Sequence, residues 1–384
     1  MSATPVVNRS DLSQVERAKR VVVKIGSSSL TDEEGRLDTH KLTSLVNVLA
    51  ARHNQGGEVV LVSSGAIAAA LTVLGLPGRP RDLPTAQAAA SVGQGLLVAH
   101  YTRAFAAHGV TVGQVLLTVE DVTRRSHYKN AQQTLTRLLA LGVLPIINEN
   151  DTVATHEIRF GDNDRLAAFV SHLTGADALV LLTDVDALYD APPSRPGAQR
   201  ISFVANPHQI SGVEVTARGS SVGTGGMVTK VEAAGMASAA GVPVILTSAQ
   251  NVAKVFAGND VGTWFASVPK RVGTRRLWLA HAAGIRGQIV VDHGAAKAIT
   301  EGKKSLLAAG VTSVQGEFES GDPVEITDSS GRVIGRGLVA YSATELPQRL
   351  GLTSAQLRQR FGDGHDREVV HRDDLVIFKQ AHPA

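Results

Sequence analysis

The sequence predicts an open α/β/α sandwich with a mostly parallel central sheet, followed by a small β-rich domain. Three observations carry this prediction. The chain has 384 residues, its composition is 43% hydrophobic and 19% charged, and short apolar runs alternate with longer helical patterns over the first two-thirds of its length. A chain of this length normally forms two domains, and its composition supports a buried core. The alternation of strand-like and helix-like segments is typical of α/β folds.

The predicted strands of the first domain are short and almost continuously apolar, as strands buried on both faces of a parallel sheet are. They are Val21–Ile25, Val59–Ser63, Thr111–Leu117, Leu144–Asn148, Ala178–Thr183 and Val242–Leu246. The helical segments between them are Lys41–Arg52, Thr85–His108, Asn130–Leu141 and Asp164–Leu173. In such sheets ligands bind beyond the carboxyl ends of the strands, so the residues that follow each strand are the candidate site residues.

The pattern changes after about residue 265, where short alternating runs separated by Gly, Asp and Ser predict a small β-rich domain. These runs are Gly287–Asp292, Val311–Gly316, Val324–Thr327 and Val333–Tyr341. We expect an N-terminal extension at 1–18, a large α/β domain at 19–267, a basic linker at 268–280, a β-rich domain at 281–360 and a C-terminal tail at 361–384.

Composition excludes several classes of site. Cysteine is absent, which excludes a disulfide framework, cysteine metal sites and a thiol nucleophile, and which fits a reducing compartment. The 13 histidines show no metal-ligand spacing. The polar N-terminus lacks the apolar core of a signal peptide, and no apolar run approaches the roughly 20 residues of a membrane helix. We therefore expect a soluble, cytoplasmic protein without a membrane partner.

Two lysines lie beside glycine-containing segments that could cradle phosphate. Lys24 leaves the first strand and is followed by Gly26 and a run of serines, so backbone N–H groups and an ammonium could face an anion together. The glycine-rich segment 219–230 ends in Lys230 at a predicted helix start, as a closing phosphate loop would. The alternative to a phosphate site at Lys24 is a lysine at a strand end before a serine-rich turn. The alternative for the segment 219–230 is a mobile linker.

Acidic and amide side chains gather after other strands. The sequences Asn-Glu-Asn-Asp at 148–151 and Gly-Asp-Asn-Asp at 161–164 could hold an ammonium group, orient lysines or take part in Mg²⁺ binding. Ser64 and the pair Thr183–Asp184 also follow predicted strands. The alternative for the acidic clusters is a polar loop that caps the next helix. Lysines, carboxylates and glycine turns together indicate phosphoryl transfer, in which positioning and charge neutralisation do most of the catalysis.

Taken in order, these motifs resemble the amino-acid kinase family, in particular its members that phosphorylate the γ-carboxylate of glutamate with ATP at the start of proline biosynthesis. The resemblance covers about residues 20–265 through the motifs VVVKIGSSSL, SSGAIA, QAAASVGQ, NAQQTL, PIINENDTVA, RFGDNDRLAA, LLTDVDALY and GTGGMVTK. Residues 282–346 resemble the PUA domain found at the C-terminus of many bacterial members. The resemblance therefore implies the amino-acid kinase fold with a PUA-like domain after it.

The resemblance also implies roles for the residues at matching positions. Lys24, Lys230 and Asp164 would be catalytic, with the lysines on the ATP phosphates and the aspartate holding them. Glutamate would be bound by Ser64, Asp151, Asn163 and Asp162. ATP would be bound by Lys24, Gly26, Thr183, Asp184, Thr224, Gly225, Gly226, Met227, Val228, Thr229 and Lys230. No residue would ligate a metal directly, because Mg²⁺ would be held by the ATP phosphates.

The partners implied by the resemblance are L-glutamate, ATP, proline as a feedback inhibitor, further copies of the chain in a dimer or tetramer, and a downstream glutamyl-phosphate reductase. Two alternatives remain at this point. One is a related kinase acting on another carboxylate, on carbamate or on a nucleotide monophosphate. The other is an RNA-binding protein, because PUA domains are often found in such proteins. Residues 281–384 carry 12 basic and 13 acidic side chains, so we do not expect nucleic acid as a partner.

Overall fold

The computed structural model describes residues 14–118, 121, 125–153, 163–193, 195–205, 226–267, 279, 285–302, 304–362 and 366–378. The chain divides into two compact units, Met1–Thr274 and Arg275–Ala384, and the division falls inside the segment expected to be a linker. Each unit has its own cluster of buried apolar side chains.

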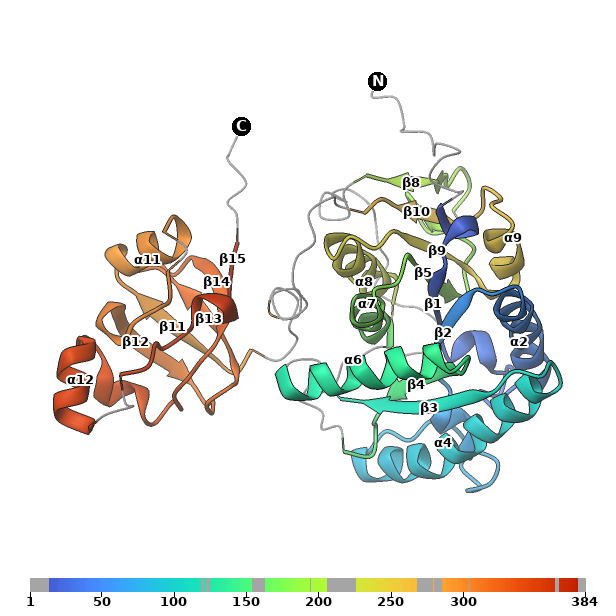
Figure 1. Ribbon diagram of the computed structural model, residues 1–384, viewed down its shortest axis with the longest axis horizontal. Helices are drawn as coiled ribbons and strands as arrows, with labels where there is room; N and C mark the ends of the chain where they lie inside the picture. Colours follow the sequence, from blue (N-terminus) through green and yellow to red (C-terminus); the bar gives the residue numbers. More distant parts are fainter. Residues whose placement is uncertain are drawn as a thin grey trace. The chain divides into compact units, whose positions relative to one another are not determined.

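The larger unit is built on one eight-stranded sheet with the order β3-β4-β2-β1-β5-β9-β10-β8 (Figure 1). Its strands are β1 (Arg20–Ile25), β2 (Glu58–Ser63), β3 (Val112–Leu117), β4 (Leu144–Glu149), β5 (Ala178–Thr183), β8 (Phe203–Val204), β9 (Val244–Ser248) and β10 (Thr263–Phe265). The pairs from β3 to β9 are parallel, whereas β10 pairs antiparallel with β9. The prediction of a mostly parallel sheet is therefore confirmed. The last two strands in this order, β10 and β8, escaped prediction because two or three residues are too few to display a period.

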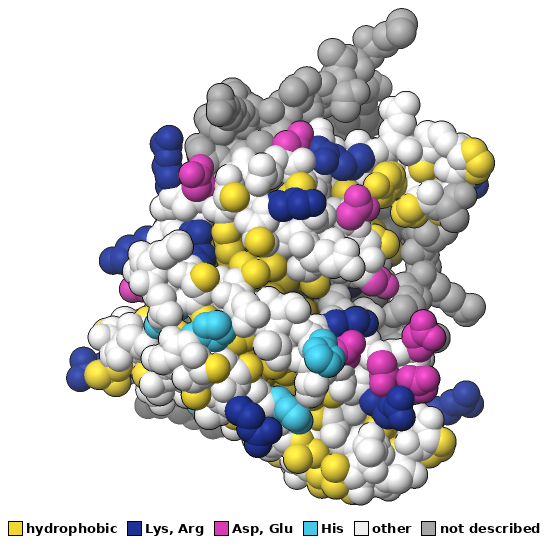
Figure 2. Space-filling view, turned by 90° about the vertical axis from the view of Figure 1, so that its right-hand side faces the viewer, with side chains coloured by type: hydrophobic (Ala, Val, Ile, Leu, Met, Phe, Trp, Pro, Cys, Tyr) yellow, Lys and Arg dark blue, Asp and Glu magenta, His cyan; other side chains and the backbone are white. Residues whose placement is uncertain are grey.

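Helices cover both faces of this sheet (Figure 1). On one face α6, α7 and α8 pack against one another in that order, and on the other α2 packs against α4 and α9. The helices are α2 (Thr39–Asn54), α3 (Ala66–Ala70), α4 (Leu83–Ala106), α6 (Arg125–Ala140), α7 (Asn163–Thr174), α8 (Met227–Ala239) and α9 (Val252–Phe256). A two-stranded ribbon, β6 (Leu188–Tyr189) with β7 (Arg200–Ile201), follows β5. On the face shown in Figure 2, basic and acidic side chains are interspersed and neither sign dominates.

Helix α2 illustrates how the sequence sets these layers. Its buried residues include Leu42, Leu45, Val46 and Leu49, which share one face of a helix with 3.6 residues per turn. The helix begins after Asp38, whose carboxylate accepts hydrogen bonds from the backbone N–H groups at the helix start. The apolar face and the cap together fix where α2 lies and where its first turn reaches the carboxyl edge of the sheet.

The smaller unit holds a five-stranded sheet with the order β12-β11-β13-β14-β15. Its strands are β11 (Gly287–Val291), β12 (Val311–Gly316), β13 (Pro323–Thr327), β14 (Val333–Leu338) and β15 (Leu375–Ile377), with helices α11 (His293–Thr300) and α12 (Ser354–Phe361). Strand β15 pairs antiparallel with β14, although it lies in the segment 361–384 that we expected to be a tail. Three residues carry too little pattern to reveal a strand, and its place depends on the partner strand. No helix in the described part of either unit is long and apolar enough to cross a membrane.

Helix α4 makes an unusually close contact with the chain that begins α3. A Cβ atom added at Gly93 would lie 1.7 Å from the carbonyl oxygen of Ala66 and 2.7 Å from its carbonyl carbon. A Cβ atom added at Gly95, two residues further along the same helix, would meet nothing within 4 Å. Only glycine at position 93 therefore allows α4 to lie this near the turn after β2.

We expect Gly93→Ala to lower the stability of the larger unit by about 3 kcal/mol or more, because the added methyl group meets backbone that cannot move aside. The thermal unfolding midpoint should then fall by roughly 6–12 °C. Gly95→Ala is the matched control and should raise the midpoint slightly, since alanine is favoured over glycine in a helix by about 1 kcal/mol. Differential scanning calorimetry of both variants measures the effect. Equal midpoints for the two variants would contradict the close-contact argument.

Candidate active site

The candidate site lies at the carboxyl edge of the sheet, where β1 separates two groups of strands. Strand β1 pairs with β2 on one side and with β5 on the other. Lys24 is the penultimate residue of β1, and only 2% of its side chain is exposed. The turn after β2 is tied to this edge, because the backbone N–H of Ser64 donates to the carbonyl oxygen of Ile25 at 3.1 Å. Lys24 therefore stands between the residues that follow β2 and those that follow β5.

Asp164 joins the two lysines predicted from the sequence. Its side chain is fully buried in the first turn of α7, where a carboxylate interacts favourably with the helix dipole. One carboxylate oxygen lies 2.5 Å from the Nζ of Lys24, and the other lies 3.2 Å from the Nζ of Lys230 in α8. One negative and two positive side chains, from three different elements, thus meet at one point. The predicted grouping of these three residues is present in the structure.

The start of α8 supports Lys230. The helix begins after Gly226, and the hydroxyl of Thr229 donates to the carbonyl oxygen of Gly226 at 2.8 Å. The same hydroxyl lies 3.4 Å from the carboxylate of Asp164. Gly26 borders the other lysine, since a Cβ atom there would lie 3.6 Å from the Nζ of Lys24. Backbone at both glycines is thus close to the charged cluster.

Asn163, beside Asp164, ties a second set of polar groups together. Its side-chain amide nitrogen donates to the hydroxyl oxygen of Ser64 at 2.9 Å, to the side-chain oxygen of Asn148 at 2.8 Å and to the carbonyl oxygen of Ser63 at 3.3 Å. The predicted residues Ser64 and Asn163 are therefore brought together. Asn148 lies in a motif that the sequence singled out, but it was missing from the predicted site residues. Its position at the carboxyl end of β4 is the sequence feature that could have identified it as a site residue.

A buried tyrosine on α4 holds the turn that carries Ser64. The Tyr101 hydroxyl lies 2.8 Å from the hydroxyl of Ser63, and the Tyr101 side chain is fully buried. Burial raises the pKa of Tyr101 well above its ordinary value, which favours the neutral phenol. The hydrogen bond to Ser63 thus ties α4 to the end of β2.

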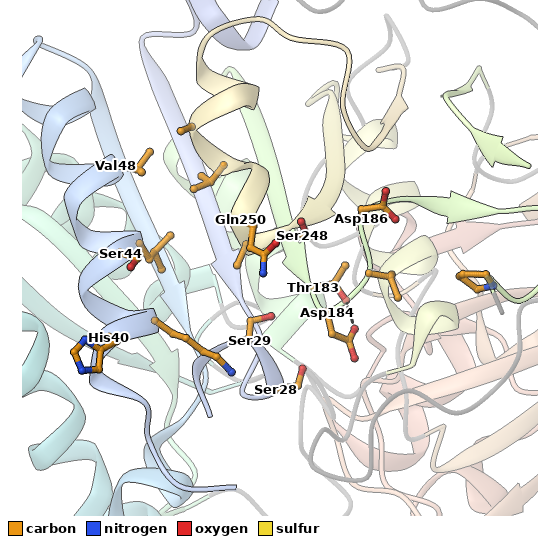
Figure 3. A pocket seen from close by; sticks show the side chains of 17 residues that line it. Ser28, Ser29, His40, Ser44, Val48, Thr183, Asp184, Asp186, Ser248 and Gln250 are labelled. Carbon is orange, nitrogen blue, oxygen red and sulfur yellow. Dashed lines mark hydrogen bonds between the residues drawn. The ribbon is translucent and has the colours of Figure 1, made fainter. Parts of the chain in front are cut away.

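A cavity of about 860 Å³ opens at the ends of β1, β5 and β9 (Figure 3). This volume falls within the range of small-molecule sites. Thr183 and Asp184 line it, and the hydroxyl of Thr183 donates to the Asp184 carboxylate at 2.8 Å. The first turns of α2 and the segment that leads into α9 add to the lining, with Lys41 and Gln250 among the residues. The predicted nucleotide residues Thr183 and Asp184 therefore border a cavity of suitable size.

Three further predicted site residues, Asp151, Met227 and Val228, lie in the described part of the chain. Asp151 lies in the turn after β4 and is partly buried. Met227 and Val228 form the first turn of α8. Asp162, Thr224 and Gly225 fall outside the described residues. Among the described residues, no group of three or more His, Asp or Glu side chains is placed to hold a metal ion.

Comparison with known families gives two matches that divide the chain as the structure does. Residues 19–248 match the amino acid kinase family, and residues 287–361 match the PUA domain. A solved structure, carbamate kinase from Giardia lamblia bound to AMP-PNP, has the same fold with a TM-score of 0.50 and 18% sequence identity, over 66% of this chain and 100% of that one. The predicted fold class and both predicted resemblances are therefore confirmed.

Curated relatives match almost the whole chain. Glutamate 5-kinase from Streptomyces coelicolor is 57% identical over 365 residues, which cover 95% of this chain and 98% of the relative. Glutamate 5-kinase from Thermobifida fusca is 54% identical over 368 residues, which cover 95% of both chains. Glutamate 5-kinase from Bifidobacterium longum is 53% identical, over 94% of this chain and 97% of the relative.

We expect Asp164→Asn to destabilise the larger unit, because it leaves two lysines facing each other without the carboxylate that joins them. Loss of one partner from a buried ion pair typically costs about 3 kcal/mol or more, so the unfolding midpoint should fall by roughly 6–12 °C. The control is Asp260→Asn. This aspartate is 56% exposed and pairs with Arg200 at the surface, so its loss should cost about 1 kcal/mol or less. If both variants melt at the wild-type temperature, Asp164 does not hold the lysines as described.

Proposed function

The chain belongs to the amino acid kinase family, and from that premise we propose that it transfers the γ-phosphoryl group of ATP to the side-chain carboxylate of L-glutamate. The observation that carries the proposal is the convergence of Lys24 and Lys230 on one buried carboxylate. The polar cluster of Asn163 and Ser64 lies directly beside it. The name glutamate 5-kinase, borne by relatives that match nearly the full length, supports glutamate as the acceptor.

The reaction needs little acid–base chemistry. The glutamate side chain has an ordinary pKa of about 4.3, so it is already ionised at neutral pH and can attack without a general base. An oxygen of this carboxylate forms a bond to the γ-phosphorus, and the bond from that phosphorus to the β–γ bridging oxygen breaks. ADP leaves with the bond's electron pair, and the acceptor becomes glutamyl 5-phosphate. No proton has to be moved in this step.

Charge neutralisation is the main contribution of the chain in this proposal. The attack of an anion on a polyanion is slow unless positive groups face the charge that spreads over the transferring phosphoryl group. Lys24 and Lys230 supply these groups, and Asp164 holds both in place before the substrates arrive. Backbone N–H groups at Gly26 and in the segment Thr224–Lys230 would complete the phosphate contacts.

Substrate binding is divided between the two sides of β1. Ser64, Asp151, Asn163 and Asp162 would bind glutamate on the β2 and β4 side. Thr183 and Asp184 would hold the nucleotide on the β5 side, where the cavity lies. This division would direct the two substrates toward the lysines from opposite sides.

We propose Mg²⁺ as the accompanying metal ion, carried on the ATP phosphates. The donors in the described part of the chain fit this arrangement better than a protein-only cage, since they include no cluster of three potential ligands. The ion would add positive charge at the phosphates when bound. Lys24 and Lys230 would lie on the same phosphates and would share the neutralisation with it.

The chemistry of the product indicates further partners. An acyl phosphate hydrolyses readily, so we propose a glutamyl-phosphate reductase as the enzyme that consumes it in the cytoplasm. Proline, as the end product of that route, would act as the feedback inhibitor. A dimer or tetramer of this chain is the proposed assembly.

Purified protein should phosphorylate L-glutamate faster than any other acceptor in a panel of aspartate, N-acetylglutamate, carbamate and UMP. ADP release with Mg-ATP measures the rate for each acceptor, and trapping of the acyl phosphate with hydroxylamine identifies the product. A greater rate with another acceptor would assign the chain to a different specificity within the family. ADP release that does not depend on any acceptor would overturn the proposal.

Replacing either lysine by methionine should lower kcat by roughly 100-fold or more, because each ammonium faces charge that develops during transfer. Methionine keeps the length of the side chain, so both variants should remain folded in circular dichroism. Lys254→Met on the exposed surface of α9 is the control and should keep the wild-type kcat. A Lys24→Met or Lys230→Met variant with wild-type turnover would remove that lysine from the mechanism.

A further inference from the structure

The motif QAAASVGQ was singled out in the sequence, but no step of the proposed reaction uses it. It occupies residues 87–94 in the first half of α4, a helix that supplies none of the predicted site residues. Its last residue, Gln94, is partly buried and accepts a hydrogen bond through Oε1 from the side-chain nitrogen of Asn148 at 2.7 Å. The motif therefore touches the polar cluster from a helix outside it.

Gly93 allows α4 to lie close enough for Gln94 to contact Asn148. With no side chain at position 93, α4 lies directly against the backbone of Ala66, at the turn that also carries Ser64. The next residue in the helix then projects its amide toward Asn148 at the end of β4. Gly93 thus lets α4 lie close to Ala66, and Gln94 makes a hydrogen bond with Asn148.

The contact belongs to a directed chain of hydrogen bonds. Asn148 donates to Gln94, and its own side-chain oxygen accepts from Asn163 at 2.8 Å and from the backbone N–H of Glu149 at 2.9 Å. Asn163 in turn donates to the hydroxyl oxygen of Ser64. Asn148 has both its side-chain nitrogen and its side-chain oxygen engaged, so its amide cannot turn over without breaking these hydrogen bonds.

Two groups at the end of this chain have hydrogen-bonding capacity that no contact among the described residues uses. The side-chain oxygen of Asn163 is buried and has no hydrogen-bond partner within the described residues, and an acceptor in that position calls for a donor from outside. The Ser64 hydroxyl oxygen accepts from Asn163, which leaves its hydrogen for an acceptor. One acceptor and one donor that lie side by side suit an ammonium and a carboxylate, the two groups that every α-amino acid carries.

We propose that Gln94 is a positioning residue for the amino-acid substrate. It holds the Asn148 amide in one place, and Asn148 holds Asn163 so that its oxygen faces the substrate ammonium while Ser64 faces a carboxylate. Gln94 itself touches no substrate atom in this proposal. The inference rests on the proposed function, because it deepens the acceptor side of that same site.

The test is the variant Gln94→Met, which keeps the length of the side chain and removes the acceptor oxygen. The KM for glutamate should rise by roughly tenfold, equivalent to about 1.4 kcal/mol, while the KM for ATP and kcat change by less than about twofold. Gln133→Met is the matched control, because Gln133 lies on an exposed part of α6 and receives the same chemical change. Gln94→Ala, which shortens the side chain as well as removing the oxygen, should give the same pattern as Gln94→Met.

A double variant separates positioning from simple stabilisation of the fold. If Gln94 acts only through Asn163, its loss should add little once Asn163 is gone. The KM for glutamate of Gln94→Met/Asn163→Ala should then stay within about twofold of Asn163→Ala alone. Multiplied effects in the double variant, or an equal rise in both KM values, would overturn the proposal.

Turnover by the wild-type protein distinguishes failure of the Gln94 proposal from failure of the proposed function. Glutamate turnover by the wild type together with an unchanged glutamate KM in Gln94→Met would overturn the role of Gln94 alone. Absence of glutamate turnover in the wild type would overturn the proposed function on which that role rests. Thermal shift with glutamate gives a readout apart from turnover, and the midpoint increase should be smaller in Gln94→Met than in the wild type.

Discussion

The buried carboxylate of Asp164 is the interaction on which the rest of the site depends. It holds one lysine from β1 and one from α8, at 2.5 and 3.2 Å, and it is itself fixed in the first turn of α7. A buried charge of this kind is costly unless its partners stay in place. The sheet and the helix layer that packs α7 against α8 provide that constraint. The two ammonium groups are thereby held in place, and the phosphoryl transfer that we propose would use this fixed arrangement to neutralise charge.

The order of strands places different groups of residues on the two sides of Lys24. Strand β1 lies between β2 and β5, so the residues that follow β2 and β4 gather on one side of Lys24 and those that follow β5 and β9 gather on the other. An amide and hydroxyl cluster occupies the first side, and a cavity of about 860 Å³ occupies the second. A sheet of this kind can present an acceptor and a phosphoryl donor to the same lysines without either blocking the other.

Helix α4 lies outside the charged cluster but packs closely against the chain that carries the neighbouring polar residues. Gly93 removes the one atom that would keep α4 away from the turn after β2, and Gln94 and Tyr101 then make hydrogen bonds to Asn148 and Ser63. Both bonds reach strand ends that carry the polar cluster around Asn163. Packing and polar contacts therefore act together, since the glycine lets α4 lie close to the chain whose polar groups its side chains contact.

Local pattern in the sequence determined the six main strands, the helices between them, the family and the pair of lysines. Apolar runs and helical periods are local, so they can be read without knowledge of what packs against them. The grouping of the two lysines with Asp164 was implied by the resemblance, whereas the contacts that Asn148 makes were decided by the tertiary structure. Asn148 and Gln94 are 54 residues apart in the chain, and their contact depends on the strand order and on one glycine. The short strands β8, β10 and β15 were likewise beyond prediction, because two or three residues hold no period and only a partner strand makes them strands.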